Sequence, residues 1–210
     1  MDAEFWLTRW EKREVGFHQE EINRYLEPYW PSLKLAKDCT VLVPLCGKSK
    51  DMRWLAQQGH HVLGVELSEI AVREFFEEWE VQPTVDLRGP FTRYSGKNVE
   101  LLVGDFFALT VEDLQEVRGV YDRAALVALP PDMRREYVNL LGERLPANTQ
   151  TLLITFEYSD GALEGPPFSI QVDAVKDLFE GRWAIHTLER QPFDFRGVDA
   201  IEHAFRLEYF

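Results

Sequence analysis

Two residues in the first half of the chain, Gly47 and Glu66, have the types and spacing of a nucleoside-binding site. Gly47 follows an apolar, β-branched run, and a second apolar run ends at Glu66, 19 residues further on. A glycine in a strand-to-helix turn lets a ligand approach the backbone, and an acid at about this offset accepts hydrogen bonds from a ribose diol. The pattern indicates a ribose-containing ligand, although a plain β-α-β unit with a surface glutamate would look the same.

The composition of the turn narrows the choice of nucleoside. It contains a single glycine, which Pro44, Leu45 and Cys46 precede. A dinucleotide-binding turn uses three glycines to hold a pyrophosphate, so that class of ligand is disfavoured. A nucleoside without phosphates fits better, and S-adenosyl-L-methionine (SAM) is the first candidate.

The elements that must position these residues form a β-α-β unit. Residues 40–44 and 62–65 have the apolar composition of buried parallel strands. A helix is expected between them, with Ser49 at its N-cap and Gly59 just after its end. Ligands of open α/β sheets bind at the carboxyl ends of such strands, which is where Gly47 and Glu66 would lie.

The rest of the chain continues the alternation of strands and helices. Further strands are expected at 99–103, 120–127, 151–156, 183–188 and 201–209, and helices from Ser68, at 131–145 and at 172–179. Residues 82–98, rich in proline and glycine, are expected to be an irregular connection with one short strand or turn. Residues 1–38 are expected to be an aromatic-rich arm with helices near 5–13 and 20–26, packed at the mouth of the crevice.

Length and charge restrict the class of protein. The 210 residues are enough for a single domain, 1–210, and their net charge of −13 disfavours a nucleic-acid substrate, which needs clustered Lys and Arg. No apolar run is long enough to span a membrane, and the acidic first residues lack the features of a signal peptide. We therefore expect a cytoplasmic protein that is a monomer and has no membrane partner.

Cys39 and Cys46 are expected to be free thiols. They flank one extended strand, which would hold them about 20 Å apart. A disulfide needs Cα atoms within about 7 Å, and this spacing is not that of a metal site. The sequence therefore predicts neither a disulfide nor a bound metal.

Seven strands with a C-terminal antiparallel hairpin form the outline of the class I SAM-dependent methyltransferase (Rossmann-like) fold. Several motifs, taken in order along the chain, resemble those of the thiopurine S-methyltransferase family. They are Arg9-Trp10-Glu11, Gly16-Phe17-His18-Gln19, Pro44-Leu45-Cys46-Gly47-Lys48, Gly64-Val65-Glu66-Leu67-Ser68, Asp122-Arg123-Ala124-Ala125-Leu126-Val127 and Gly165-Pro166-Pro167-Phe168. The likeness runs from residue 9 to the C-terminus, and its one departure is Ala124, where animal members have glycine.

The resemblance implies a role for each matched residue. Contacts to SAM are implied for Trp10, Leu45, Glu66 and Arg123, with Asp105 and Phe106 at the adenine, and Gly47 is expected beside them from its place in the turn. A border around the methyl acceptor is implied for Phe17, His18, Arg123 and Arg196, of which Arg196 lies in the least similar surroundings. Phe168, like Phe17, is expected to stack on a flat acceptor. The products would be S-adenosyl-L-homocysteine and an S-methylated aromatic or heterocyclic thiol such as a thiopurine.

Such a methyl transfer depends on alignment of the two reactants more than on a catalytic base. A heteroaromatic thiol is more acidic than the cysteine thiol, whose pKa is about 8.5, so no dedicated catalytic base is expected. Arg123 can stabilise a thiolate but cannot take its proton near neutral pH.

Other readings of the same residues stay open. Trp10 could be an ordinary core residue, Arg123 an ion-pair partner of Asp122, and His18 a turn residue. Alternative functions are methylation of selenium or tellurium species or of other small thiols, and a non-catalytic SAM-binding module.

Overall fold

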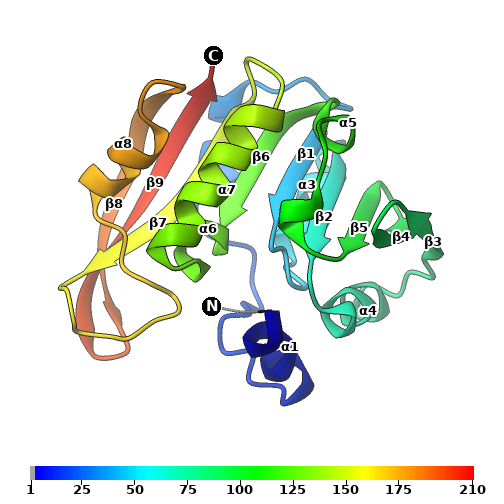
Figure 1. Cartoon of the computed structure of the whole chain (residues 1–210), viewed down its shortest axis with the longest axis horizontal. Coiled ribbons are helices and arrows are strands. Elements are labelled where there is room, and N and C mark those ends of the chain that lie inside the picture. The colour runs from blue at the N-terminus through cyan, green and yellow to red at the C-terminus, as the bar shows by residue number, and fades with distance from the viewer. Residues whose placement is uncertain (1–2) are drawn as a thin grey trace.

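A mixed β-sheet runs through the molecule (Figure 1). The computed structural model describes residues 3–210, in which the strands are β1 (Thr40–Pro44), β2 (His61–Glu66), β3 (Thr84–Arg88), β4 (Phe91–Gly96), β5 (Val99–Val103), β6 (Val117–Arg123), β7 (Gln150–Tyr158), β8 (Trp183–Phe195) and β9 (Val198–Tyr209). Their order across the sheet is β3-β4-β5-β2-β1-β6-β7-β9-β8. The five strands from β5 to β7 are parallel, and the strands beyond them at both edges are antiparallel. Strands β2 and β5 lie on one side of β1, and the later strands β6 and β7 lie on its other side. Ligands of open α/β sheets bind where the strand order reverses in this way, so the carboxyl ends of β1 and β6 are the expected ligand position.

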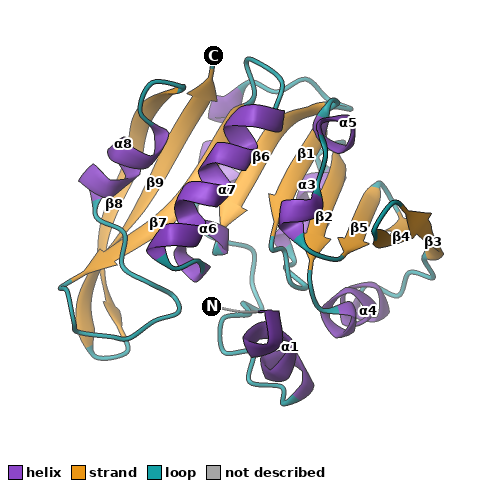
Figure 2. Cartoon of the chain, in the orientation of Figure 1, coloured by secondary structure: helices purple, strands orange, loops and turns teal. Residues whose placement is uncertain are grey.

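Helices cover both faces of this sheet, as Figure 2 shows. They are α1 (Ala3–Glu11), α2 (Leu26–Tyr29), α3 (Asp51–Gln57), α4 (Glu69–Glu78), α5 (Val111–Leu114), α6 (Ala125–Ala128), α7 (Pro131–Arg144) and α8 (Val172–Phe179), with 3-10 turns η1 (Trp30–Leu33) and η2 (Phe106–Ala108). The buried side chains of α5, α6, α7 and α8 join one apolar core, and those of α2, η1, α3 and α4 join a second core on the opposite face. Helix α1 stands apart, below the carboxyl ends of the central strands (Figure 1).

The class I methyltransferase architecture expected from the sequence is present, with one correction to the strand count. Seven strands were expected, whereas residues 3–210 contain nine, because β3 and β4 form a hairpin inside the region expected to be irregular. Gly89 and Pro90 are the two-residue turn of this hairpin, since Arg88 pairs with Phe91. The prolines and glycines therefore mark a turn between strands and not the loss of strand structure.

Two other boundaries differ from the expectation. The fourth predicted strand, 120–127, ends as β6 at Arg123, because Ala124 adopts φ +80° and starts the buried helix α6. A short apolar run does not by itself distinguish a buried strand from a buried helix. In the N-terminal arm the expected helix at 20–26 is replaced by α2 and η1, and the backbone N–H of Asn23 donates to Asp51. The first two residues of the arm lie outside the described part of the chain.

The C-terminal hairpin is longer than predicted. Phe195 pairs with Val198, so Arg196 and Gly197 form its two-residue turn, with φ +57° and +81°. Both central residues of a type I′ turn have positive φ, which matches the right-handed twist of the strands. Arg196 therefore stands at the tip of the hairpin.

Cys39 and Cys46 are free thiols, as predicted. Within residues 3–210, no helix is both long and apolar enough to cross a membrane.

Candidate functional site

A cavity of about 750 Å³ opens where the central strands end. Its walls come from the loops that follow β1, β2, β5 and β6, from the strands β7, β8 and β9, and from the N-terminal arm. The structure brings ten of the eleven predicted site residues to this cavity: Trp10, Phe17, His18, Leu45, Gly47, Glu66, Asp105, Phe106, Arg123 and Arg196. Predicted residues up to 186 positions apart in the sequence, Trp10 and Arg196, thus share one site.

The turn after β1 has a backbone that few side chains tolerate. Leu45 has φ +47° and Gly47 has φ +52°, so two of three consecutive residues are left-handed. Such a conformation costs a non-glycine residue on the order of 1–3 kcal/mol and is concentrated at functional sites. A Cβ on Gly47 would lie 3.3 Å from the Trp10 ring, so this indole rests directly on the turn. Trp10 is 3 % exposed and lines the cavity, so it is both a packed residue and a wall of the site.

Glu66 is held rigidly at the end of β2. Its side chain is buried, and its two carboxylate oxygens accept hydrogen bonds from the backbone N–H groups of Gly47 (2.9 Å) and Ser68 (2.8 Å). Burial raises the pKa of Glu66 above its ordinary value, and the backbone donors oppose that rise. Each carboxylate oxygen still has capacity for a further donor, so a ribose diol can be recognised by a preoriented group.

Asp105 and Phe106 follow β5 on the same rim. The Asp105 carboxylate accepts a hydrogen bond from the backbone N–H of Phe107 (3.0 Å), which caps η2 and fixes the direction of the loop. Phe106 is 2 % exposed, and its ring lies 5.2 Å from the ring of Tyr137. The pair gives this rim an exposed acid and a buried aromatic ring, a combination suited to a purine.

Of the two neighbours Asp122 and Arg123, Asp122 faces the core and Arg123 faces the cavity. The Asp122 carboxylate turns inward, where it accepts hydrogen bonds from the Tyr137 hydroxyl (2.7 Å) and the Leu126 backbone N–H (3.1 Å). Burial raises the pKa of Asp122 to about 6. Its hydrogen-bonding partners are thus in the protein core, while Arg123 lines the cavity. Asp122 holds the start of α6, and the left-handed Ala124 separates that helix from Arg123.

Aromatic side chains of the N-terminal arm form the outer wall. The Phe17 ring meets the rings of both Trp6 and Trp10 edge to face, with centroids 5.6 Å apart in each case. His18 follows Phe17, and its Nε2 is a buried atom without a hydrogen-bond partner among the described residues. Burial, followed by the nearby Lys48, lowers the pKa of His18, which keeps the imidazole neutral near pH 7.

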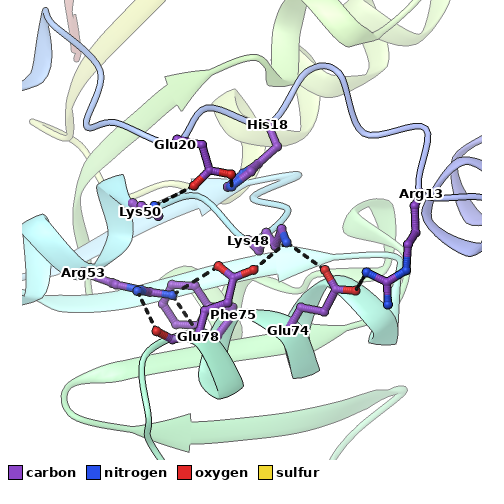
Figure 3. A network of polar contacts seen from close by, with 9 residues as sticks. All are labelled: Arg13, His18, Glu20, Lys48, Lys50, Arg53, Glu74, Phe75 and Glu78. Carbon is purple, nitrogen blue, oxygen red and sulfur yellow. Dashed lines mark hydrogen bonds and ion pairs between the residues drawn. The ribbon is translucent and has the colours of Figure 1, made fainter.

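Ion pairs fasten the arm to the β1–α3 turn and to α4, as Figure 3 shows. Lys48, whose side chain is only 11 % exposed, contacts Glu74 at 2.8 Å and Glu78 at 2.6 Å. Arg13 of the arm reaches the same Glu74 at 3.1 Å. Glu74 therefore bridges a cation of the arm and a cation of the turn.

A second connection joins the arm to the β1–α3 turn through Glu20, close to His18. Lys50 contacts Glu20 at 2.8 Å, and His18 Nε2 lies 3.7 Å from the same carboxylate (Figure 3). The pKa of Glu20 is lowered by its hydrogen bond to Lys50. Together the two connections hold the arm across the mouth of the cavity.

The far wall of the cavity was largely missed by sequence reasoning. Phe156 of β7 contacts Phe193 and Phe195 of β8, with ring centroids 6.0 and 5.1 Å away. All three line the cavity, together with Tyr121 and Glu202. The i, i+2 spacing of Phe193 and Phe195 indicates that they share one face of a strand. The pairing of β7, β8 and β9, which brings them to the cavity, depends on tertiary structure and could not be predicted from that spacing.

Phe168 is the predicted residue that the cavity lining does not include. Pro166 and Pro167 form the wall at this point, and the Arg134 guanidinium lies 5.6 Å from the centre of the Phe168 ring. The Phe168 backbone N–H donates to the Val127 carbonyl (2.7 Å), which anchors the loop beside α6. Stacking of Phe168 on an acceptor stays a prediction.

Solved structures with this fold include SAM-dependent methyltransferases of low sequence similarity. The 1,6-didemethyltoxoflavin-N1-methyltransferase of Burkholderia thailandensis, solved with S-adenosylhomocysteine, superposes with a TM-score of 0.67 at 16 % identity, over 99 % of this chain and 86 % of that one. A SAM-dependent methyltransferase of Methanosarcina mazei gives 0.66 at 15 % identity, over 90 % and 99 % of the two chains. The fold is therefore that of class I SAM-dependent methyltransferases, whose methyl donor is SAM.

Comparison of sequences gives a narrower result. Thiopurine S-methyltransferase of Pseudomonas putida is 48 % identical over 202 residues, which are 96 % of this chain and 90 % of that protein. The enzyme of the same name from Azotobacter vinelandii is 45 % identical over 216 aligned positions, covering 99 % of each chain. The model of the thiopurine S-methyltransferase family matches residues 1–205. This chain belongs to the thiopurine S-methyltransferase family.

Proposed function

We propose that the protein transfers the methyl group of SAM to the sulfur of an aromatic or heterocyclic thiol, such as the thiopurine 6-mercaptopurine. The observation that carries the proposal is a single cavity that connects the Gly47–Glu66 turn with Arg123 and a wall of phenylalanines. A nucleoside-binding end and a cationic, aromatic end share one space, as a bisubstrate transfer requires.

The residues at the first end fit SAM. Glu66 would receive the ribose diol, Gly47 and the Leu45 backbone would lie along the ligand, and Trp10 would pack over it. The rim formed by Asp105 and Phe106 would hold the adenine. Bound there, SAM supplies a methyl group on a sulfonium, and S-adenosyl-L-homocysteine is what remains after transfer.

The residues at the second end fit a flat, acidic thiol. Arg123 and Arg196 would stabilise negative charge on the acceptor sulfur, and Phe17 and the Pro166-Pro167 wall would border its ring. The neutral imidazole of His18 would border the acceptor beside Phe17. No residue is needed as a base, because the acceptor ionises by itself near neutral pH and alignment does the rest.

Selenium and tellurium species, other small thiols and a non-catalytic role are less well supported. Three phenylalanines in contact around the acceptor end form a surface for a ring, which a small oxyanion would not use. We also propose that residues 1–210 act as one domain, in the cytoplasm and as a monomer.

The proposal is tested by SAM binding and turnover in matched variants. Glu66→Gln should weaken SAM binding roughly tenfold to a hundredfold, because it loses charge-assisted hydrogen bonds worth about 1.5–3 kcal/mol. Glu77→Gln, an exposed carboxylate of α4, is the control and should bind SAM like the wild type. Isothermal titration with SAM and S-adenosyl-L-homocysteine measures this, and an end-point assay with 6-mercaptopurine follows. Binding without S-methyl product would contradict the proposed acceptor class.

A further inference from the structure

Glu202 is a carboxylate that lines the cavity at the end where Arg123 and the phenylalanines lie, which is the proposed acceptor end. It lies on β9 and pairs across the sheet with Phe156 of β7, and both residues line the cavity. In the same sheet Arg123 of β6 pairs with Ile154 of β7, two residues before Phe156. Side chains two residues apart on a strand share a face, so Glu202 belongs to the floor that carries Arg123.

The carboxylate is anchored from the N-terminal segment. Arg24 donates to Glu202 Oε2 (2.7 Å) and to the Tyr25 hydroxyl (2.7 Å), and its guanidinium lies 4.7 Å from the centre of the Tyr25 ring. The Glu202 side chain is 17 % exposed, whereas that of Arg24 is 53 % exposed. One oxygen is thus held by a surface arginine, and a carboxylate has four lone-pair sites in all, so capacity remains for a ligand.

Arg123 and Glu202 both act electrostatically on the Tyr121 side chain. The buried Tyr121 hydroxyl donates to Asp51 (2.9 Å), and Tyr121 also lines the cavity. Burial raises the pKa of Tyr121 well above its ordinary value, Glu202 adds to that rise, and Arg123 opposes it. The acceptor end therefore combines a cation and an anion near one phenol, and is not simply a cationic pocket.

This pair of charges matches the chemistry of a heteroaromatic thiol. A purine thiol such as 6-mercaptopurine loses the proton that its sulfur shares with the adjacent ring nitrogen and keeps the N–H of its imidazole ring, so the acceptor presents a negative sulfur and a ring N–H that donates. We propose that Glu202 is a specificity-determining residue whose carboxylate accepts a hydrogen bond from a ring N–H of the acceptor, with Arg123 at the sulfur. The assignment rests on the proposed function and extends it to acceptors that carry an N–H in the ring.

The test compares two acceptors in one variant. Glu202→Gln is assayed with 6-mercaptopurine, which has ring N–H groups, and with 4-nitrobenzenethiol, which has none. We expect kcat/KM to fall about tenfold or more for 6-mercaptopurine, because a charge-assisted hydrogen bond is lost, and to stay within about twofold for 4-nitrobenzenethiol. The ratio of wild type to variant is taken for each acceptor separately, so the difference in their acidity cancels.

Two controls separate recognition from structural damage. Glu189→Gln removes another carboxylate bound to the N-terminal segment, through Tyr29, on β8 and outside the cavity lining, and should leave both acceptors unaffected. Turnover of 4-nitrobenzenethiol by Glu202→Gln itself reports that the variant is folded and binds SAM. An equal fall for both acceptors, or no change for either, would overturn the role of Glu202 alone. A wild-type protein that methylates neither thiol would overturn the proposed function, and this inference with it.

Discussion

Arg123 is the residue whose side chain should matter most for turnover. It lines the cavity directly after β6, while its neighbour Asp122 is occupied in the core. Removing one preorganised charge donor from a transition state typically costs a factor of about 10² to 10³ in rate. Arg123→Ala should therefore lower kcat/KM for 6-mercaptopurine by about 10²-fold, and titration should show a much smaller change in SAM affinity.

Arg196 should give a smaller effect in the same direction. It is exposed at the tip of the β8–β9 hairpin, where its guanidinium lies 5.0 Å from the centre of the Phe195 ring. Solvent screens an exposed charge, so Arg196→Ala should cost a few-fold in kcat/KM. Unchanged kcat/KM in both arginine variants would refute their place at the acceptor.

Asp122 should titrate near pH 6. Burial raises its pKa to about 6 from an ordinary value of 3.8, so between these values the folded protein binds more protons than the unfolded chain. Its contribution to stability is complete below about pH 4 and is lost as the pH rises to about 6, a change of roughly 3 kcal/mol. The carboxyl carbon chemical shift of Asp122 should show a midpoint near 6, and near a higher pH in Tyr137→Phe. A midpoint near 4 would contradict the burial of an ionisable group here.

Ala124 occupies a position that favours glycine. Its φ of +80° lies in the left-handed region, which glycine adopts without the steric cost of a Cβ. Ala124→Gly should raise the free energy of unfolding by about 0.5–1 kcal/mol, as measured by urea denaturation. Ala125→Gly, one residue further and inside α6, should instead destabilise the protein by about 1 kcal/mol. A loss of stability in both would show that the left-handed conformation is not a strain.

At the scale of elements, ion pairs fasten the N-terminal arm, and we propose that the arm acts as a lid over the cavity. Glu74 of α4 holds Arg13 of the arm and also contacts Lys48 of the β1–α3 turn. Glu74→Gln would remove the ion-pair partner of Arg13 and would weaken the hold on the arm. Trypsin should then cut the arm several times faster at Lys12 and Arg13, which are exposed, and added SAM should slow the cut in the wild type.

Asp173→Asn is the matched control for this experiment. It removes a carboxylate from an ion pair with Lys176 that is exposed on both sides, at 86 % for Asp173 and 61 % for Lys176. Exposed pairs of this kind contribute little, so cleavage of the arm should keep its wild-type rate. Equal cleavage of the arm with and without SAM would argue against closure of a lid over the cavity.

For the whole molecule, the central β-α-β unit was the most predictable part. Thr40–Pro44 and His61–Glu66 form the expected strands, and Gly47 and Glu66 meet through a direct hydrogen bond across their 19-residue separation. Two continuous apolar runs and a single glycine were enough to predict this unit, because each strand is buried on both faces and the turn after the first strand is local. The helix at 172–179 was likewise predicted to the residue.

What could not be predicted depended on tertiary pairing. The β3–β4 hairpin has an exposed strand without an apolar run, and Thr84–Arg88 is held instead by pairs such as Asp86 with Arg93. Glu202 could not be singled out from the sequence because it is one of many acids, and only the pairing of β7 with β9 brings it to the cavity. Resemblance to the family supplied Trp10, Phe17 and Arg196, which no local pattern singles out.

Sedimentation equilibrium should give the mass of one chain. The outer strand β3 is short and carries the half-buried charged residues Asp86 and Arg88, which discourage edge-to-edge pairing. Leu87 is 81 % exposed on the same strand. A concentration-dependent dimer that Leu87→Lys disrupts would contradict the proposed monomer.

The most direct test of the account follows the methyl group itself. The protein is incubated with SAM labelled with ¹³C in its methyl group and with 6-mercaptopurine, and the products are analysed by NMR and mass spectrometry. We expect the label to appear on the purine sulfur, in equal amount with S-adenosyl-L-homocysteine, and Arg123→Ala to slow its appearance. Label on a ring nitrogen, or no labelled purine although SAM binds, would contradict transfer to an aromatic thiol.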